Sequence, residues 1–404
     1  MRLLSKMMHR FVKVGELTII DANDLSHVFG PGGDGPSATI KLHDKKLHRS
    51  LFLNPELKAG EAYMNGTLTV EDGTIRDFLT VFAMNAQYLR GQGHQKRLRA
   101  FYKRIKRFHQ RNLKSASRKN VEHHYDLSNK FYKLFLDDDM QYSCAYFEND
   151  DMTLEDAQLA KKRHIAAKLN LKPGLRVLDI GCGWGGMALY LAEHCDVHVT
   201  GVTLSTQQHA LAQERIIEKG LEDEVDIRLQ DYRELKGPFD RIVSVGMFEH
   251  VGVGHFPEFF QKSYELLSDD GCFLLHSIGR RGGPGSTAAW IRKYIFPGGY
   301  SPAVSETVAE IEKSGFWISD MEILRLHYGK TILEWDKRFQ KNRDKVASMM
   351  DERFCRMWEF YLIVSEFSFL YSKNMNFQIQ MVKKVDGVPI TRDYMFEAEN
   401  ALRS

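Results

Sequence analysis

Short apolar runs alternate with longer, helix-forming stretches along the chain from Asn120 onward. An apolar run bounded by turn residues is typical of a strand buried on both faces, and strands separated by helices build βαβ units. The runs lie at residues 176–180, 197–202, 225–229, 241–245 and 272–276. This pattern predicts an α/β domain whose mostly parallel sheet is covered by helices on both faces.

The first 90 residues follow a different pattern. Strand-like runs at 17–20 and 38–42 are separated by turn clusters such as the glycine- and proline-rich stretch 30–36. We interpret this part as a small α+β domain. At 404 residues the chain is long enough for two domains. The predicted divisions are a small domain at 1–90, a basic linker helix at 91–119 and a larger domain at 120–404.

The composition is that of an ordinary globular protein, with 43% apolar and 27% charged residues. No apolar run approaches the roughly 18 residues needed to span a bilayer, and the N-terminus lacks the apolar stretch of a signal peptide. We therefore expect a cytoplasmic protein. The five cysteines are widely spread and contain no CxxC, so we predict neither disulfides nor a metal site.

The linker segment is strongly basic. Between Arg90 and Lys119 there are twelve Lys and Arg residues and no Asp or Glu, although the net charge of the whole chain is only +3. Apolar residues recur at helical spacing among these charges, as expected for a helix lying on an anionic membrane. Nucleic-acid binding and a solvated helix docked on one domain remain alternatives. The apolar positions are Leu98, Phe101, Tyr102, Ile105 and Phe108.

A glycine-rich turn follows the first predicted strand of the larger domain. Residues 175–186 read LRVLDIGCGWGG, and Gly181, Gly183 and Gly186 match the GxGxxG pattern that bends a strand tightly into a helix. This spacing suits a dinucleotide and S-adenosylmethionine equally well. The glycines could also serve only close strand-to-helix packing.

The flanking carboxylates favour S-adenosylmethionine. A nicotinamide site usually has an acidic residue at the end of the second strand, but residues 201–205 contain none. Asp179 instead precedes the glycines, and Asp231 with Tyr232 follows the third strand. These are positions where methyltransferases orient the methionine and adenine ends of their cofactor.

Several segments, in the same order along the chain, closely resemble the cyclopropane fatty acid synthase family, which includes the mycolic acid methyltransferases. The resemblance extends from Val121 to the C-terminus, and its first two segments are far more selective than a glycine loop. The segments are VEHHYDLSN at 121–129, QYSCAYF at 141–147, LDIGCGWGG at 178–186, VTLS at 202–205, MFEHVG at 247–252, LHSIG at 275–279 and HYGKTILEW at 327–335.

This resemblance implies a Rossmann-like class I methyltransferase fold with a mostly parallel seven-stranded sheet, beside the smaller N-terminal α+β domain. It also implies transfer of a methyl group from S-adenosylmethionine to the cis double bond of an acyl chain in a membrane phospholipid. A carbocation forms, and loss of a proton to a bound bicarbonate ion closes a cyclopropane ring. The enzyme would work at the inner face of the membrane on anionic lipid, without nucleic acid, and a homodimer is left open.

The resemblance assigns residues to two groups. The catalytic group, which would hold the bicarbonate, comprises Cys144, Glu249, His276, the backbone of Ile278, and Tyr328. The cofactor-binding group comprises Tyr142, Ser143, Asp179, Gly181, Gly183, Thr203, Leu204, Gln208, Asp231 and Tyr232.

These residue types suit the implied chemistry. An alkene is a weak nucleophile, so the site must align it with the methyl group and exclude water from the cation. Aromatic faces stabilise a cation, and a carboxylate such as Glu249 can orient an acid–base group. Packing alternatives exist: Cys144 could be a small buried hydrophobe, and His276 a core histidine. The candidate aromatic residues are Tyr142, Tyr146, Phe147, Trp290, Phe296, Tyr300 and Tyr328.

The chain departs from the family pattern near its C-terminus. Where members often read YLxxCE, residues 361–366 read YLIVSE, so a role for a cysteine there cannot be transferred. Two other functions stay open, and this departure hints only at the second. The same cation could lose a different proton and leave a methylated alkene, or the chain could be a lipid-binding protein without turnover.

Overall fold

The computed structural model describes residues 1–90 and 128–403 of the chain. The predicted basic segment at 91–119 and the first seven residues of the VEHHYDLSN segment lie outside these described residues. The chain divides into two compact units. The first takes its residues from Met1–Lys106, Ser286–Ile295 and Ile332–Ser372, and the second from Arg107–Gly285, Phe296–Thr331 and Lys373–Ser404.

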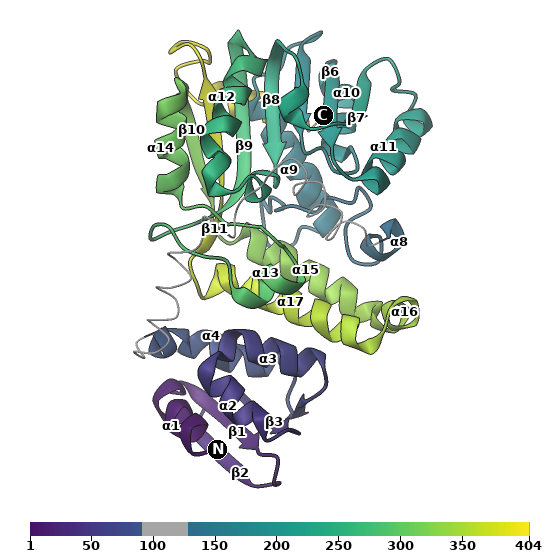
Figure 1. Cartoon of the computed structure of the whole chain (residues 1–404). Coiled ribbons are helices and arrows are strands. Elements are labelled where there is room, and N and C mark those ends of the chain that lie inside the picture. Colours follow the sequence, from purple (N-terminus) through teal and green to yellow (C-terminus); the bar gives the residue numbers. More distant parts are fainter. Residues whose placement is uncertain (91–127, 404) are drawn as a thin grey trace. The chain divides into compact units, whose positions relative to one another are not determined.

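The N-terminal part of the first unit is an α+β structure, as the turn-rich pattern predicted. Its four strands pair in the order β2-β1-β3-β4, with β1 and β3 parallel and the other neighbours antiparallel. Four helices accompany this sheet (Figure 1). The elements are α1 (Arg2–Phe11), β1 (Gly15–Ile20), β2 (Ser26–Gly32), β3 (Ser37–Leu42), α2 (Lys46–Leu53), α3 (Pro55–Met64), β4 (Leu68–Asp72) and α4 (Ile75–Arg90).

The first unit also includes two later segments, which the domain boundaries predicted from the sequence had assigned to the domain at 120–404. Their helices bury apolar surface against α3 and α4, which the linear pattern does not reveal. Trp290, for example, lies 4.7 Å from the ring of Phe360 and donates its indole N–H to the sulfur of Met64. The helices are α13 (Ala289–Tyr294), the later turns of α15 (His327–Lys341), α16 (Arg343–Met349) and α17 (Glu352–Leu370).

The YLIVSE segment has a structural task in this unit. Both carboxylate oxygens of Glu366 accept hydrogen bonds from the guanidinium of Arg76, at 3.1 and 2.7 Å, and Arg76 also pairs with Asp336 at 2.7 Å. Glu366 and Asp336 are buried. This ion pair joins α4 to α15 and α17, so removing one partner would leave an uncompensated buried charge.

The second unit contains the predicted sheet, which has seven strands in the order β10-β11-β9-β8-β5-β6-β7. The strands β9, β8, β5, β6 and β7 are parallel neighbours, and β11 runs antiparallel to both β9 and β10. The expected class I methyltransferase fold, with its mostly parallel sheet, is confirmed. The strands are β5 (Arg176–Ile180), β6 (His198–Thr203), β7 (Val225–Leu229), β8 (Phe239–Val245), β9 (Leu267–Arg280), β10 (Trp317–Leu324) and β11 (Asn374–Val382).

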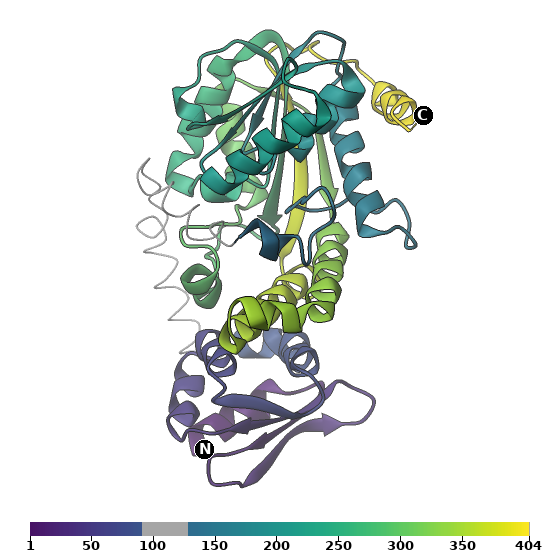
Figure 2. The same ribbon diagram turned by 90° about the vertical axis from the view of Figure 1, so that its right-hand side faces the viewer.

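Helices cover both faces of this sheet (Figures 1 and 2). Neighbouring residues of a strand face opposite sides, so Val177 joins the apolar cluster under α9, α10 and α11, while Leu178 joins the cluster under α12 and α14. The helices of this unit are α8 (Asn129–Tyr132), α9 (Leu154–Lys168), α10 (Gly186–Cys195), α11 (Thr206–Lys219), α12 (Phe256–Leu266), α14 (Val304–Ser314) and α18 (Asp393–Ala401), with short 3-10 turns η1 (Tyr232–Glu234), η2 (Phe248–His250) and η3 (Val253–His255).

The two apolar clusters leave the carboxyl ends of the parallel strands at one edge of the sheet, where ligands bind in open α/β folds. Across residues 1–90 and 128–403, none of the helices combines the length and apolar character needed to cross a membrane.

Candidate active site

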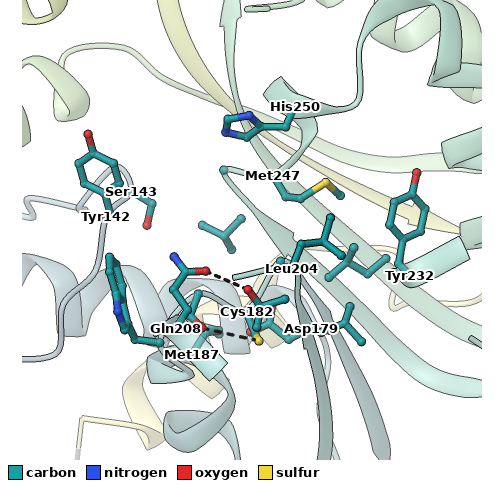
Figure 3. Close-up of a pocket in the computed structure, with 18 of the residues that line it drawn as sticks. Tyr142, Ser143, Asp179, Cys182, Met187, Leu204, Gln208, Tyr232, Met247 and His250 are labelled. Atoms are coloured by element: carbon teal, nitrogen blue, oxygen red, sulfur yellow. Dashed lines mark hydrogen bonds between the residues drawn. The ribbon is translucent and has the colours of Figure 1, made fainter. Parts of the chain in front are cut away.

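A cavity opens at the carboxyl ends of β5, β6 and β8 (Figure 3). All ten residues that the sequence assigned to the cofactor line it. Eight of them lie in or after β5, β6 and β7, because parallel strands bring their following loops together, and Tyr142 and Ser143 come from the segment before α9. Tyr142 and Ser143 lie across the open space from Met247, Leu204 and Asp179. The structure thus places the predicted cofactor group around one cavity.

The glycine turn shapes the floor of this cavity. Gly181 and Gly183 have φ angles of +85° and +56°, which residues with a side chain rarely adopt. A Cβ atom on Gly181 would lie 2.7 Å from Cβ of Met247, whereas one on Gly183 would meet no protein atom within 4 Å. Gly181 therefore serves close packing, and Gly183 keeps space open toward the cavity.

The turn after β6 presents an amide to the cavity. The hydroxyl of Thr203 donates to Oε1 of Gln208 at 2.9 Å, and the side chain of Ser205 caps α11 by accepting from the backbone N–H of Gln208. Because Oε1 is held by Thr203, the amide nitrogen of Gln208 is turned to the open space (Figure 3). The turn offers neutral polar groups to a ligand and no carboxylate, unlike a nicotinamide site.

Two aspartates line the cavity in different electrostatic states. Asp231 is held by Arg233, whose guanidinium donates to both carboxylate oxygens at 2.9 and 2.6 Å. Asp179 is fully buried, and burial raises its pKa to about 7. Its Oδ2 atom has no hydrogen-bond partner among the described residues. An unsatisfied buried carboxylate of this kind suits a ligand that carries an ammonium group.

A second cluster lies beside the cavity, at the ends of β8 and β9. Oε1 of Glu249 accepts a hydrogen bond from the backbone N–H of Ile278 at 2.6 Å, so two members of the predicted catalytic group are in contact. Oε2 of Glu249 is buried without a partner among the described residues. Burial raises the pKa of Glu249 to about 7, although the Ile278 amide opposes the shift.

His276 is held as a neutral imidazole inside the sheet. Burial and the nearby ammonium groups of Lys161 and Lys168 lower its pKa well below the usual value. Its Nδ1 and Nε2 atoms lie 3.1 and 2.5 Å from the side-chain amides of Gln378 and Asn376. A neutral imidazole has one donor and one acceptor nitrogen, so one of these amides must present its oxygen.

The neighbouring lysine decides which amide this is. Oε1 of Gln378 accepts from Nζ of Lys168 at 2.7 Å, so Gln378 can offer only its NH₂ group to His276. Nδ1 is then the acceptor, and Nε2 carries the proton. Asn376 must present its oxygen to Nε2, which also satisfies an oxygen that otherwise has no partner among the described residues.

The other two predicted catalytic residues come from separate segments. Cys144 is fully buried and burial raises its pKa, so it is a thiol at neutral pH. The next backbone N–H, of Ala145, donates to Oγ1 of Thr331 at 3.0 Å. Tyr328 lies in the first turn of the same helix, α15, about one turn before Thr331. The QYSCAYF and HYGKTILEW segments are therefore adjacent.

None of the five predicted catalytic residues lines the cavity itself, although Ser143 and His250, next to Cys144 and Glu249 in the chain, do. Sequence reasoning missed His250, which is buried and whose pKa burial lowers to about 4. Membership of the MFEHVG segment was the signal that could have indicated it. Other lining residues not predicted are Met140, Gln141, Ile180, Cys182, Trp184, Met187, Val202, Gln230, Arg233, Val245, Gly246, Met247, Val251, His255 and Pro297.

The seven-stranded sheet, the glycine turn after β5 and the cavity at the strand ends define an S-adenosylmethionine-dependent methyltransferase of class I. Residues 112–379 match the protein family described as mycolic acid cyclopropane synthetase. The chain belongs to this family, so the resemblance seen in its motifs is confirmed.

Individual relatives support the same assignment. The chain is 40% identical over 347 residues to the cyclopropane-fatty-acyl-phospholipid synthase of Escherichia coli K12, which covers 84% of this chain and 87% of that protein. It is 36% identical over 377 residues to a probable fatty acid methyltransferase of Pseudomonas putida, covering 90% and 93%.

Among solved structures, the cyclopropane synthase MmaA2 from Mycobacterium tuberculosis aligns with a TM-score of 0.62 at 33% identity, over 65% of this chain and 97% of that one. The mycolic acid cyclopropane synthase CmaA1, solved with S-adenosylhomocysteine, gives the same TM-score at 34% identity, with the same coverage. Coclaurine N-methyltransferase aligns at 0.66 but with 19% identity, so it shows the fold alone.

Cofactor binding is expected to release a proton from Asp179. With a pKa of about 7 this carboxyl is partly protonated at neutral pH, and the cofactor ammonium favours the ionised form. Affinity should therefore rise as the pH increases from 6 to 8. Calorimetry in buffers of different ionisation enthalpy measures the released proton, and in Asp179→Asn both effects should disappear. An unchanged pH dependence in that variant would contradict the assignment.

Proposed function

We propose that this enzyme transfers a one-carbon unit from S-adenosylmethionine to the cis double bond of an acyl chain in a phospholipid and closes a cyclopropane ring. The chain's similarity to the E. coli phospholipid synthase over most of both lengths supports this substrate class. The single structural observation behind it is the buried Glu249, which is positioned by Ile278 and whose Oε2 atom, beside the cavity, has no hydrogen-bond partner among the described residues.

The reaction needs few groups but strict placement. The alkene attacks the sulfonium methyl, so a C–C bond forms while the C–S bond breaks and leaves a neutral thioether. The resulting cation loses one proton of the transferred methyl, and that electron pair closes the ring. The residues of the chain must align the alkene, exclude water and hold an acceptor for the proton.

The residue types of the predicted catalytic group fit a small oxyanion such as bicarbonate. In its protonated form Glu249, with a pKa near neutrality, can donate a hydrogen bond from Oε2, and the Tyr328 hydroxyl is a further donor. The Cys144 thiol donates to the backbone oxygen of Ala145 at 3.4 Å, so it would turn from that oxygen to the ion. These three residues would hold the ion, and when bound it would supply the base. His276 would take part as a neutral imidazole, with its proton on Nε2 and donated to Asn376.

A methylated alkene or a methylene-branched chain is the second candidate product. The similarity to a probable fatty acid methyltransferase over 90% of the chain favours it. The two products differ only in which proton the cation loses, so the placement of the proton acceptor decides between them.

The function is tested with purified enzyme, labelled S-adenosylmethionine and vesicles of a monounsaturated phosphatidylglycerol. We expect label in the acyl chain. Because a ring and a methylated alkene have equal mass, fragmentation after derivatisation of double bonds must locate the change. Loss of the double bond would support cyclopropanation. A double bond that is retained and methylated would overturn it in favour of the second candidate product. Lipid without label would support a protein that lacks turnover.

The basic segment at 90–119 is expected to recruit the enzyme to anionic lipid, on the evidence of its sequence. Each basic residue near such a surface contributes roughly 1 kcal/mol, screened over about 8 Å at physiological salt. Replacing Lys103, Arg104, Lys106 and Arg107 with Gln should reduce sedimentation with anionic vesicles at least tenfold and leave cofactor affinity unchanged.

The matched control variant removes the same charge from exposed positions of the second unit. It replaces Lys172, Lys219, Arg228 and Lys236 with Gln. This control variant should sediment like the parent. Equal sedimentation by both quadruple variants would eliminate the membrane interpretation. Reduced stability of the first variant with full vesicle binding would favour a docked helix.

A further inference from the structure

A lysine is completely buried behind the wall of the cofactor cavity. Lys161, in α9, is 1% exposed, which is rare for a lysine without an ionic partner. Its Nζ donates to Oε1 of Gln141 at 2.5 Å and to Oγ of Ser143 at 2.9 Å, both neutral groups. Within residues 1–90 and 128–403 no carboxylate forms an ion pair with it, and its pKa, lowered to about 8 by burial, leaves it mostly charged at pH 7.

The cavity segment that Lys161 contacts is held firmly. Gln158, one turn earlier on α9, donates from Nε2 to the backbone oxygens of Gln141 and Ser143, at 3.1 and 3.0 Å. The carboxylate of Asp137 accepts from the backbone N–H of Gln141 at 2.9 Å. Residues 141–143 line the cavity, so the Lys161 ammonium is separated from the cavity by only one layer of side chains.

This contact fixes the direction of the Ser143 hydroxyl. Lys161 has only donors, so Ser143 must accept from it, and the Ser143 proton is left to point elsewhere. The Ser143 side chain reaches into the open space of the cavity (Figure 3). Ser143 therefore offers a hydrogen-bond donor to a ligand, strengthened by the positive charge behind it.

Asp179 and the Ser143–Lys161 pair together match the two charges of an amino-acid group. Asp179 has a buried oxygen, unpartnered within residues 1–90 and 128–403, that can accept from an ammonium, while Ser143 with Lys161 provides a donor and a positive charge for a carboxylate. Lys161 is also close enough to Asp179 to lower the pKa of that carboxyl against the effect of burial. The methionine end of S-adenosylmethionine carries both complementary charges.

We propose that Lys161 is a positioning residue that recognises the carboxylate of the methionine end of the cofactor, acting through the hydroxyl of Ser143. The proposal requires an S-adenosylmethionine cofactor and is independent of the product that the enzyme forms. Loss of cyclopropanation in the lipid assay would therefore leave it standing.

Lys161→Met tests the charge with little change of shape. Binding is measured by calorimetry for S-adenosylhomocysteine, for its decarboxylated analogue, and for 5′-methylthioadenosine. A charge-assisted hydrogen bond contributes about 1.5–3 kcal/mol, so S-adenosylhomocysteine should bind about 10- to 100-fold more weakly. The two ligands without a carboxylate should change less than twofold.

Two further variants complete the experiment. Lys162→Met removes the neighbouring lysine, which pairs with Asp139 at 2.7 Å, and should show no preference among the three ligands. Ser143→Ala keeps the buried charge and should also weaken only the carboxylate-bearing ligand, so it carries the test if Lys161→Met does not fold. Equal weakening of all three ligands in both Lys161→Met and Ser143→Ala would show that the pair only holds the cavity wall. Unchanged binding would also overturn the proposal.

Discussion

Gly183→Val is expected to lower the affinity for the cofactor at least about 100-fold in a protein that still folds. The added side chain meets no protein atom within 4 Å, so the packing of the turn survives and only the cavity is filled. The backbone, at a φ of +56°, costs about 1–2 kcal/mol for a residue with a Cβ atom. Calorimetry with S-adenosylhomocysteine measures the loss.

Gly220→Val is the matched control. Gly220 ends α11 with a φ of +63°, and a Cβ atom there also meets nothing within 4 Å, but the residue does not line the cavity. The two variants should lose similar stability on thermal unfolding, and only Gly183→Val should lose binding. A folded Gly183→Val protein with the affinity of the parent would show that the cofactor lies elsewhere.

Glu249→Gln is expected to lower kcat at least about 100-fold while the affinity for S-adenosylhomocysteine stays within twofold. Removing a positioned acid–base group typically costs 10²- to 10⁴-fold. Gln can still accept the hydrogen bond from the Ile278 amide, so the local geometry persists and only the ionisable oxygen is replaced. His276→Ala should also lose turnover and not cofactor affinity. Steady-state kinetics and calorimetry separate the two effects.

The same substitution has an expected effect on stability. The folded pKa of Glu249 is raised to about 7 from 4.5, so the folded state holds its proton more tightly than the unfolded state. Its contribution to stability is therefore complete below about pH 4.5 and is lost as the pH rises through 7. The free energy of unfolding, measured with denaturant, should therefore fall less between pH 5 and pH 8 in Glu249→Gln than in the parent protein. Part of the pH dependence of the unfolding free energy should remain in this variant, because the pKa of Asp179 is raised in the same direction.

Parent-like turnover in Glu249→Gln would remove Glu249 from the proton-accepting site. An exposed glutamate of α12, Glu265, provides the control, since Glu265→Gln should change neither kcat nor the pH dependence of stability.

The sequence could predict the parallel strands well because each is recognisable from its own residues. The predicted runs at 176–180 and 225–229 coincide with β5 and β7, and the other three lie within or one residue from β8, β9 and β6. Strand β11 was not predicted from its pattern. Its polar residues, Asn376, Gln378 and Gln380, suggest an exposed face, yet all three are buried because they bond to His276 and Lys168.

By itself, the sequence determined the family, the class of fold and ten of the residues that line the cavity at the strand ends. Glycines at positive φ, apolar strands and the residues that follow them are local features, and parallel pairing then gathers their carboxyl ends at one edge. Only the tertiary structure decided that α13 and α17 belong with the N-terminal unit, that the tautomer of His276 depends on Gln378, and that Lys161 is buried behind Ser143. These properties depend on which distant groups share a buried site, and the energy of a buried charge or hydrogen bond depends on its partners rather than on its neighbours in the chain.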